Sequence, residues 1–108
     1  MSFNVMLLES AGKDLESIYR YLKQSAGETI ALREIETLEA ACDSLTENPE
    51  RGNIPPELER TGAIEYRQII SKSYRIIYQV DEINVFIFAI IHGRRSIQDI
   101  LRQRIIIK

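Results

Sequence analysis

Residues 64–91 read IEYRQIISKSYRIIYQVDEINVFIFAII, and this stretch decides the fold. It contains three runs rich in β-branched and aromatic residues, at 64–70, 73–80 and 84–91, a composition typical of β-strands. The links between them, Ser71-Lys72 and Asp81-Glu82, are short enough for hairpin turns. We therefore predict an antiparallel meander. The third run does not alternate between apolar and polar residues, so we expect a central strand covered on both faces.

Two helices are predicted before the meander. Leu15, Ile18, Tyr19 and Leu22 follow the spacing of a helix with one buried face, and Ala26-Gly27 supplies its end. So short a link to the next helix predicts an antiparallel helical hairpin. The second helix carries its own apolar stripe, at Ala31, Ile35, Leu38, Cys42 and Leu45.

Each end of the chain adds one short element. Phe3, Val5 and Leu7 alternate with other residues, which predicts a strand that breaks at residues 9–12. Near the other end, Ser96 and Asp99 fit a helix-capping signature and predict a short helix from 96 to about 104. The predicted fold class is α+β, with a helical hairpin packed on a mostly antiparallel sheet, in a single domain over residues 1–108.

The composition argues against several classes of protein. A single cysteine, Cys42, cannot form an internal disulfide, and with one histidine, His92, we expect no metal site and no cofactor. The longest apolar run, residues 85–91, is far shorter than the ~20 residues of a membrane span. We therefore expect a cytoplasmic protein that is not inserted in a membrane.

Charge is distributed unevenly along the chain. The net charge is −2, but residues 1–59 carry a net −7 and residues 60–108 a net +5. The two halves are therefore expected to meet different partners. For residues 1–59 the alternative is that solvated helices are simply rich in glutamate.

The register of the first hairpin determines where its arginines point. If Ile70 faces Tyr74 across the turn, Arg67 and Arg75 lie on one face of the sheet, opposite the helices. Arg94 and Arg95, just after the third strand, would then extend a basic surface suited to phosphate or carboxylate. The alternative is that each arginine is solvated or paired with a nearby acid.

Four segments in order resemble the RelE/ParE toxin superfamily: ESAGKDLESIYRYL at 9–22, ENPERGNIPPEL at 47–58, YRQIISKSYRIIYQV at 66–80 and IIHGRRSIQDIL at 90–101. The resemblance implies the toxin of a type II toxin–antitoxin pair, held inactive by a cognate antitoxin that is usually encoded beside it.

The resemblance also bears on the chemistry. In ribonuclease members, positions matching Arg75 and Arg95 stabilise the phosphate, and a tyrosine stands where this chain has Leu101. This departure, together with the HGRR segment at 92–95, indicates the ParE-like branch, which acts by binding DNA gyrase rather than as an enzyme. Two alternatives stay open: a ribosome-dependent mRNA interferase with His92, Arg75 and Arg95 at its site, and a non-toxic antitoxin-binding module.

Two binding surfaces follow from this interpretation. The target would meet Arg67, Arg75, Arg94 and Arg95. The antitoxin would lay a helix into a groove near Ile30 and Leu32, with its acidic side chains meeting Arg67 and Arg75. A dimer or a toxin–antitoxin hetero-oligomer is the expected assembly.

Overall fold

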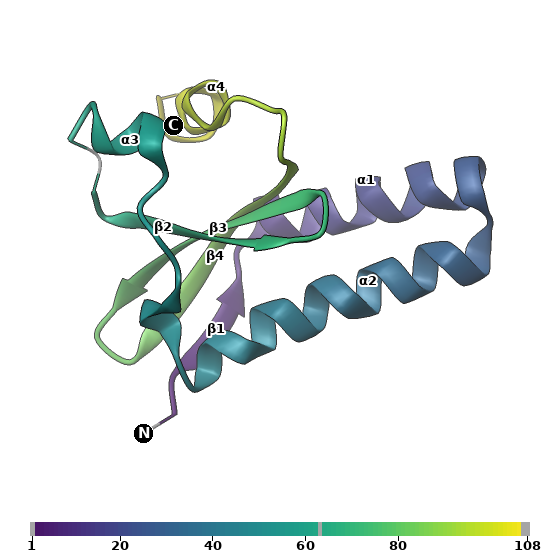
Figure 1. Ribbon diagram of the computed structural model, residues 1–108, viewed down its shortest axis with the longest axis horizontal. Helices are drawn as coiled ribbons and strands as arrows, with labels where there is room; N and C mark the ends of the chain where they lie inside the picture. Colours follow the sequence, from purple (N-terminus) through teal and green to yellow (C-terminus); the bar gives the residue numbers. More distant parts are fainter. Residues whose placement is uncertain (1, 63, 107–108) are drawn as a thin grey trace.

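The computed structural model describes residues 2–62 and 64–106. It shows a four-stranded sheet with helices on both faces (Figure 1). The strands are β1 (Asn4–Leu7), β2 (Tyr66–Ser71), β3 (Tyr74–Asp81) and β4 (Asn84–His92), in the order β1-β4-β3-β2. β1 runs parallel to β4, and the other neighbours are antiparallel. The predicted α+β class and the central place of β4 are confirmed.

One face of the sheet is covered by the helical hairpin of α1 (Glu9–Ala26) and α2 (Glu28–Asp43), which are separated by Gly27 at φ 97°. α1 begins earlier than predicted, because residues 9–12 are helical rather than a break. Ala11 is completely buried, and the Ser10 hydroxyl donates to the Phe88 carbonyl at 2.9 Å. The buried residues of this helix-covered face are Ala11, Leu38, Cys42, Leu45, Ile69, Ile76, Tyr78, Val85, Ile87 and Ile90.

The β2–β3 hairpin is shifted by one residue from the predicted register. Tyr74 pairs with Ser71 rather than with Ile70, so the two turn residues are Lys72 and Ser73. Lys72 adopts φ 54°, a left-handed conformation that costs energy for a residue with a side chain. A shift of one residue turns every side chain of β2 to the other face of the sheet.

The shift changes which β2 residues are buried. Ile69, not Ile70, packs against the helices, and Ile70 is 59% exposed. Tyr66, predicted on the helix-covered face, packs in the cluster on the opposite one. Arg67 pairs with Tyr78 and shares its face, whereas Arg75 lies on the other face. The prediction that Arg67 and Arg75 share one exposed face was wrong.

β4 contains a β-bulge. Ile77 pairs with Ala89 and Tyr78 pairs with Ile87, which leaves Phe88 as an extra residue in β4. A bulge of this kind changes the side-chain alternation at one point and bends the strand. β4 supplies buried residues to both faces, and this coverage of both faces is why its sequence does not alternate between apolar and polar residues.

The second face of the sheet is also buried, by α3 (Pro56–Glu59) and α4 (Ile97–Leu101). The predicted cap is present, since the Ser96 hydroxyl accepts from the Asp99 amide at 3.3 Å. A π-helical turn follows at residues 102–106, beyond the α-helix of the predicted segment 96–104. Within residues 2–62 and 64–106, no helix is long and apolar enough to cross a membrane. The far-face cluster contains Leu58, Tyr66, Ile77, Ala89, Ile91, Ile97, Ile100 and Leu101.

Candidate functional site

Arg67 holds the loop that precedes β2. Its guanidinium donates to the carbonyl of Gly52 at 2.8 Å. The same loop is fixed by Tyr78, whose hydroxyl donates to the carbonyl of Pro49 at 2.6 Å and accepts from the amide of Gly52 at 3.1 Å. Arg67 is therefore engaged in holding this loop against the sheet.

Arg75 is nearly buried beneath α3, with 9% of its surface exposed. Its Nε donates to the Gln68 side chain at 2.8 Å, and its two terminal nitrogens reach both carboxylate oxygens of Glu57 at 3.1 Å each. The hydrogen bonds from Arg75 lower the pKa of the Glu57 carboxyl. The planar fork that would bind a partner's phosphate or carboxylate is already occupied by Glu57.

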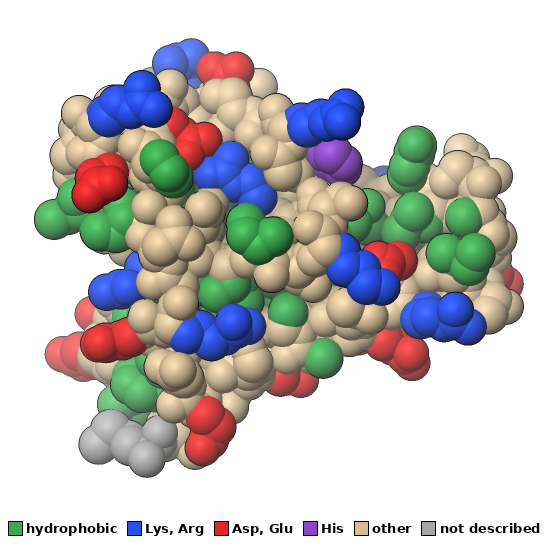
Figure 2. Space-filling view, viewed as in Figure 1, with side chains coloured by type: hydrophobic (Ala, Val, Ile, Leu, Met, Phe, Trp, Pro, Cys, Tyr) green, Lys and Arg blue, Asp and Glu red, His purple; other side chains and the backbone are tan. Residues whose placement is uncertain are grey.

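Basic side chains do not form the single exposed patch that we expected. Arg67 and Arg75 are separated by the sheet, as their pairing shows. In Figure 2, the Lys and Arg side chains are scattered over the face shown, with Asp and Glu side chains between them. Of the four predicted target-binding arginines, only Arg94 and Arg95 are exposed.

His92, Arg94 and Arg95 lie together where β4 ends. The His92 ring packs edge-on against the ring of Tyr74, with centroids 5.9 Å apart. Its Nδ1 accepts from the backbone amide of Arg94 at 3.3 Å, and its carbonyl accepts from the amide of Arg95 at 3.0 Å. Among the described residues, no carboxylate lies within 4 Å of the Arg94 or Arg95 guanidinium. These two cations are therefore available to a partner.

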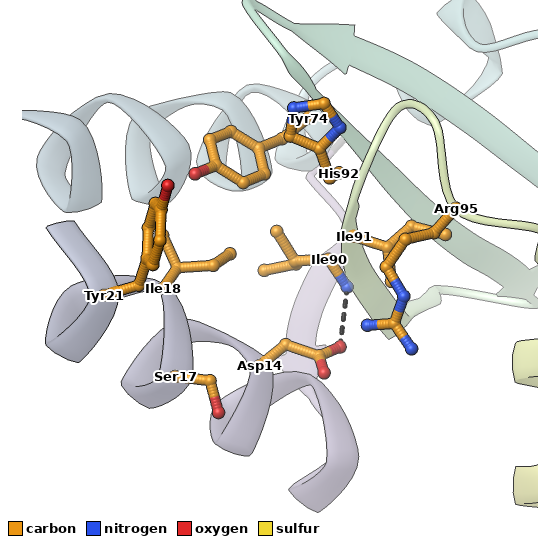
Figure 3. A pocket seen from close by; sticks show the side chains of 9 residues that line it. All are labelled: Asp14, Ser17, Ile18, Tyr21, Tyr74, Ile90, Ile91, His92 and Arg95. Carbon is orange, nitrogen blue, oxygen red and sulfur yellow. Dashed lines mark hydrogen bonds between the residues drawn. The ribbon is translucent and has the colours of Figure 1, made fainter. Parts of the chain in front are cut away.

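A pocket of about 470 Å³ opens beside this turn, between α1 and the ends of β3 and β4. Figure 3 shows the rings of Tyr21 and Tyr74 close together at one end and the Arg95 side chain pointing toward Asp14 at the other. Isoleucines lie between the two ends. We call this the β4-end pocket, and its lining residues are Asp14, Ser17, Ile18, Tyr21, Tyr74, Ile90, Ile91, His92 and Arg95.

The Asp14 carboxylate lines the β4-end pocket, but its hydrogen bonds serve the fold. β1 ends at Leu7, so the next part of β4 has no strand beside it on that edge. The Asp14 carboxylate accepts from the Ile90 amide at 2.9 Å and pairs with the Arg104 guanidinium at 2.6 Å, while Arg104 also donates to the Phe88 carbonyl at 3.1 Å. These groups satisfy the free edge of β4. They also neutralise the charge of Asp14.

Ile30 and Leu32, the predicted antitoxin contacts, are exposed on α2, at 45% and 47%. On α1, Tyr21 is 67% exposed. Figure 2 shows hydrophobic side chains gathered on the outer half of the helical hairpin, beyond the sheet. Ile30 and Leu32 do not line the β4-end pocket, and their role in binding stays a prediction.

Sequence reasoning missed Glu57, Arg104 and the wall of the β4-end pocket. The wall had a signal: residues 14, 17, 18 and 21 follow the i, i+3, i+4, i+7 spacing of one helix face, beside the buried stripe. No local pattern signals the roles of Glu57 and Arg104, because their partners, Arg75 and Asp14, lie 18 and 90 residues away in the chain. Within the described residues, no group of His, Cys, Asp and Glu is arranged to hold a metal ion.

Comparisons with known proteins identify the family. No curated protein matches the sequence. The chain is similar in structure to the chromosomal ParDE toxin–antitoxin system from P. aeruginosa, with a TM-score of 0.72, 16% identity, and coverage of 84% of this chain and 96% of that one. It is also similar to the RelBE2 toxin–antitoxin complex from Mycobacterium tuberculosis, with a TM-score of 0.56, 20% identity, and coverage of 85% and 99%.

At these identities the structural matches establish the fold alone. The sequence itself matches the family described as the ParE toxin of the type II toxin–antitoxin system parDE, over residues 5–97. That range contains the sheet except for Asn4, the helical hairpin and the turn that carries Arg94 and Arg95. The chain therefore belongs to the ParE toxin family of type II toxin–antitoxin systems.

Proposed function

We propose that this toxin arrests growth by binding DNA gyrase, without cutting RNA, and that a cognate antitoxin neutralises it. Family membership supports the toxin role and the antitoxin partner. The resemblance of the HGRR segment to ParE-like members supports gyrase as the target. Both partners would meet the chain in the cytoplasm.

The burial of Leu101 is the observation that favours binding of a target protein over cleavage of RNA. Where ribonuclease relatives place a tyrosine, this chain has a leucine that is 9% exposed in the far-face cluster. Leucine can neither donate nor accept a proton, and RNA cleavage needs a positioned acid and base. Arg75, which would hold the phosphate, is paired with Glu57.

The target surface in this proposal centres on Arg94 and Arg95. Both are exposed, and neither has a carboxylate within 4 Å among the described residues. Arginines at interfaces form strong, geometrically specific contacts with carboxylates. Arg67 and Arg75 contribute indirectly, because they hold the loop and α3 in place.

A supercoiling assay with purified gyrase and relaxed plasmid tests the proposal. The toxin should inhibit supercoiling at micromolar concentration, and the double variant Arg94→Ala/Arg95→Ala should require at least about tenfold more protein. The control is Arg33→Ala/Arg60→Ala, which removes the same charge from exposed sites elsewhere. Gyrase that remains fully active at micromolar toxin contradicts the proposal.

One observation favours the mRNA interferase as a second candidate: His92 and Arg95 line the same pocket as two tyrosines. A histidine can transfer protons near neutral pH, and an arginine can hold a phosphate. Primer extension on translated mRNA detects such cleavage. Cuts that disappear in His92→Ala would establish this candidate in place of gyrase binding, and cuts that persist would reject the role of His92.

The antitoxin interface is proposed on the outer half of the helical hairpin. Ile30 and Leu32 expose apolar surface there, as a groove for an amphipathic helix requires. The product of the neighbouring reading frame should co-purify with the toxin and abolish growth arrest. Ile30→Asp/Leu32→Asp should weaken the complex at least about tenfold. Expression of the free toxin without growth arrest would instead identify a non-toxic antitoxin-binding module.

A further inference from the structure

We infer that the β4-end pocket is a peptide-binding site, which takes a large apolar side chain of a protein partner together with a neighbouring carboxylate. The inference deepens the proposed function, and rests on it for the claim that the partner is a protein. It adds the chemistry of the residues that the partner must present.

The inner part of the pocket suits an apolar side chain. Ile18, Ile90 and Ile91 line it, and the rings of Tyr21 and Tyr74 stand at one end (Figure 3). A volume of about 470 Å³ falls in the range of ~300–1,000 Å³ that ligand pockets occupy. Tyr21 keeps 67% of its surface exposed, and exposed tyrosines beside a hollow are frequent anchor points at interfaces.

At the opposite end of the pocket, the anion is already paired and the cation is not. The Asp14 carboxylate is satisfied by Arg104 at 2.6 Å and by the Ile90 amide at 2.9 Å. Arg95 lines the same hollow, and no carboxylate of the described residues lies within 4 Å of its guanidinium. A ligand that covers this arginine must supply an anion, because an unpaired charge is costly to remove from water. A carboxylate matches the guanidinium fork.

A peptide fits the pocket better than a nucleic acid does. Proteins that bind single strands use grooves lined by several cations, whereas one guanidinium and one carboxylate line this pocket. The chain also carries a net charge of −2. The side chains of Ile18 and Ile90 match an aliphatic or aromatic side chain, which is the usual content of a protein interface core.

A titration followed by ¹⁵N-resolved nuclear magnetic resonance tests the inference with 3-phenylpropionate, which joins an aromatic ring to a carboxylate. Saturable shifts are expected at the amides of Tyr21, Ile91 and Arg95, with millimolar affinity. The uncharged 3-phenylpropanol should bind at least about tenfold more weakly. Shifts elsewhere, or equal affinity for the two molecules, would overturn the inference.

Two variants separate the halves of the pocket. Arg95→Gln should remove the difference between the charged and uncharged molecules, while Tyr21→Ala should weaken both. Arg60→Gln is the matched control, since it removes an exposed charge away from the pocket.

Uridine monophosphate that binds the same residues more tightly than 3-phenylpropionate would assign the pocket to nucleotides. If the toxin inhibits gyrase but 3-phenylpropionate does not bind the pocket, only the pocket inference is wrong. If 3-phenylpropionate binds but the toxin does not inhibit gyrase, gyrase is not the target.

Discussion

The two faces of the sheet are covered in different ways. The hairpin of α1 and α2 covers one face with helices of 18 and 16 residues. The other face is covered by α3 and α4, of four and five residues. Helices this short are not stable by themselves. Besides their buried apolar residues, polar contacts hold them: the Arg75–Glu57 ion pair, and a hydrogen bond from the Gln98 side chain to the Glu57 carbonyl at 3.3 Å.

The loop between α2 and β2 crosses from one face to the other. Tyr78 holds its first part on the helix-covered face, through Pro49 and Gly52. Asn53 then forms two backbone hydrogen bonds with Gln68 at the free edge of β2, before the chain enters α3. Apolar packing therefore holds both pairs of helices, and the short helices add specific polar contacts to it. Variants on each face can test this difference.

The largest effect is expected on the helix-covered face. Leu38→Ala should lower the free energy of unfolding by about 3 kcal/mol, because Leu38 is 1% exposed and its truncation leaves a cavity. Leu32→Ala on the same helix, where the side chain is 47% exposed, should cost less than ~1 kcal/mol. Urea unfolding measures both. Equal losses for the two leucines would show that the hairpin is not held by its buried stripe.

Gly52→Ala should cost about 2 kcal/mol, because a Cβ there would lie 2.3 Å from the Tyr78 hydroxyl and 2.6 Å from the Gln68 carbonyl oxygen. Gly12→Ala is the control. A Cβ at Gly12 meets no atom within 4 Å, and alanine in a helix should raise stability by about 0.5–1 kcal/mol. Thermal unfolding measures the stability of both variants. An unchanged stability of Gly52→Ala would mean that the loop does not pack closely against Tyr78.

Glu57→Gln should lower the free energy of unfolding by about 1–2 kcal/mol, because the buried Arg75 charge loses its partner. The neighbouring Glu59→Gln, at an exposed site, should change it by less than ~0.5 kcal/mol. Hydrogen exchange should also show faster opening of α3 in Glu57→Gln only. Unchanged exchange in α3 would contradict the role given to the ion pair.

The smallest effect is a dependence of stability on pH. The folded-state pKa of Glu57 lies below its ordinary value of 4.5, so its contribution is present above that pH and is lost as pH falls through the folded-state pKa. The stability difference between the native chain and Glu57→Gln should therefore be constant near neutral pH and shrink in acid. Urea unfolding between pH 7 and pH 3 measures it. A difference that grows in acid would contradict the prediction.

The elements of the fold could be predicted from local patterns. The stripe from Ala31 to Leu45, the end of α1 at Gly27 and the cap at Ser96 depend on residues near one another in the chain. The start of α1 could not be predicted in this way, because residues 9–12 carry no local helix signal and Ala11 is buried against residues distant in the chain. The register of the β2–β3 hairpin could not be predicted either, because two possible turns differ by only one residue. The positive φ of Lys72 would have been signalled by a glycine or asparagine, and neither stands at that position.

The candidate site was predicted less well than the fold, for the same reason. Arg94 and Arg95 follow β4 directly, so their exposed position depended on the strand alone. Arg67 and Arg75 depended on the register, and a shift of one residue separated them. The covering of Arg75 by Glu57 depended on how the long loop packs, which no local pattern determines.

The pair formed by Asp14 and Arg104 joins positions 90 residues apart. Proteins are synthesised from the N-terminus, so α1 is complete long before its arginine partner exists. Until residue 104 has left the ribosome, the edge of β4 beyond Leu7 lacks this clamp and the Asp14 carboxylate has no countercharge from it. The nascent toxin therefore passes through a stage in which that strand edge is open to other chains, and this stage lasts until Arg104 can reach Asp14.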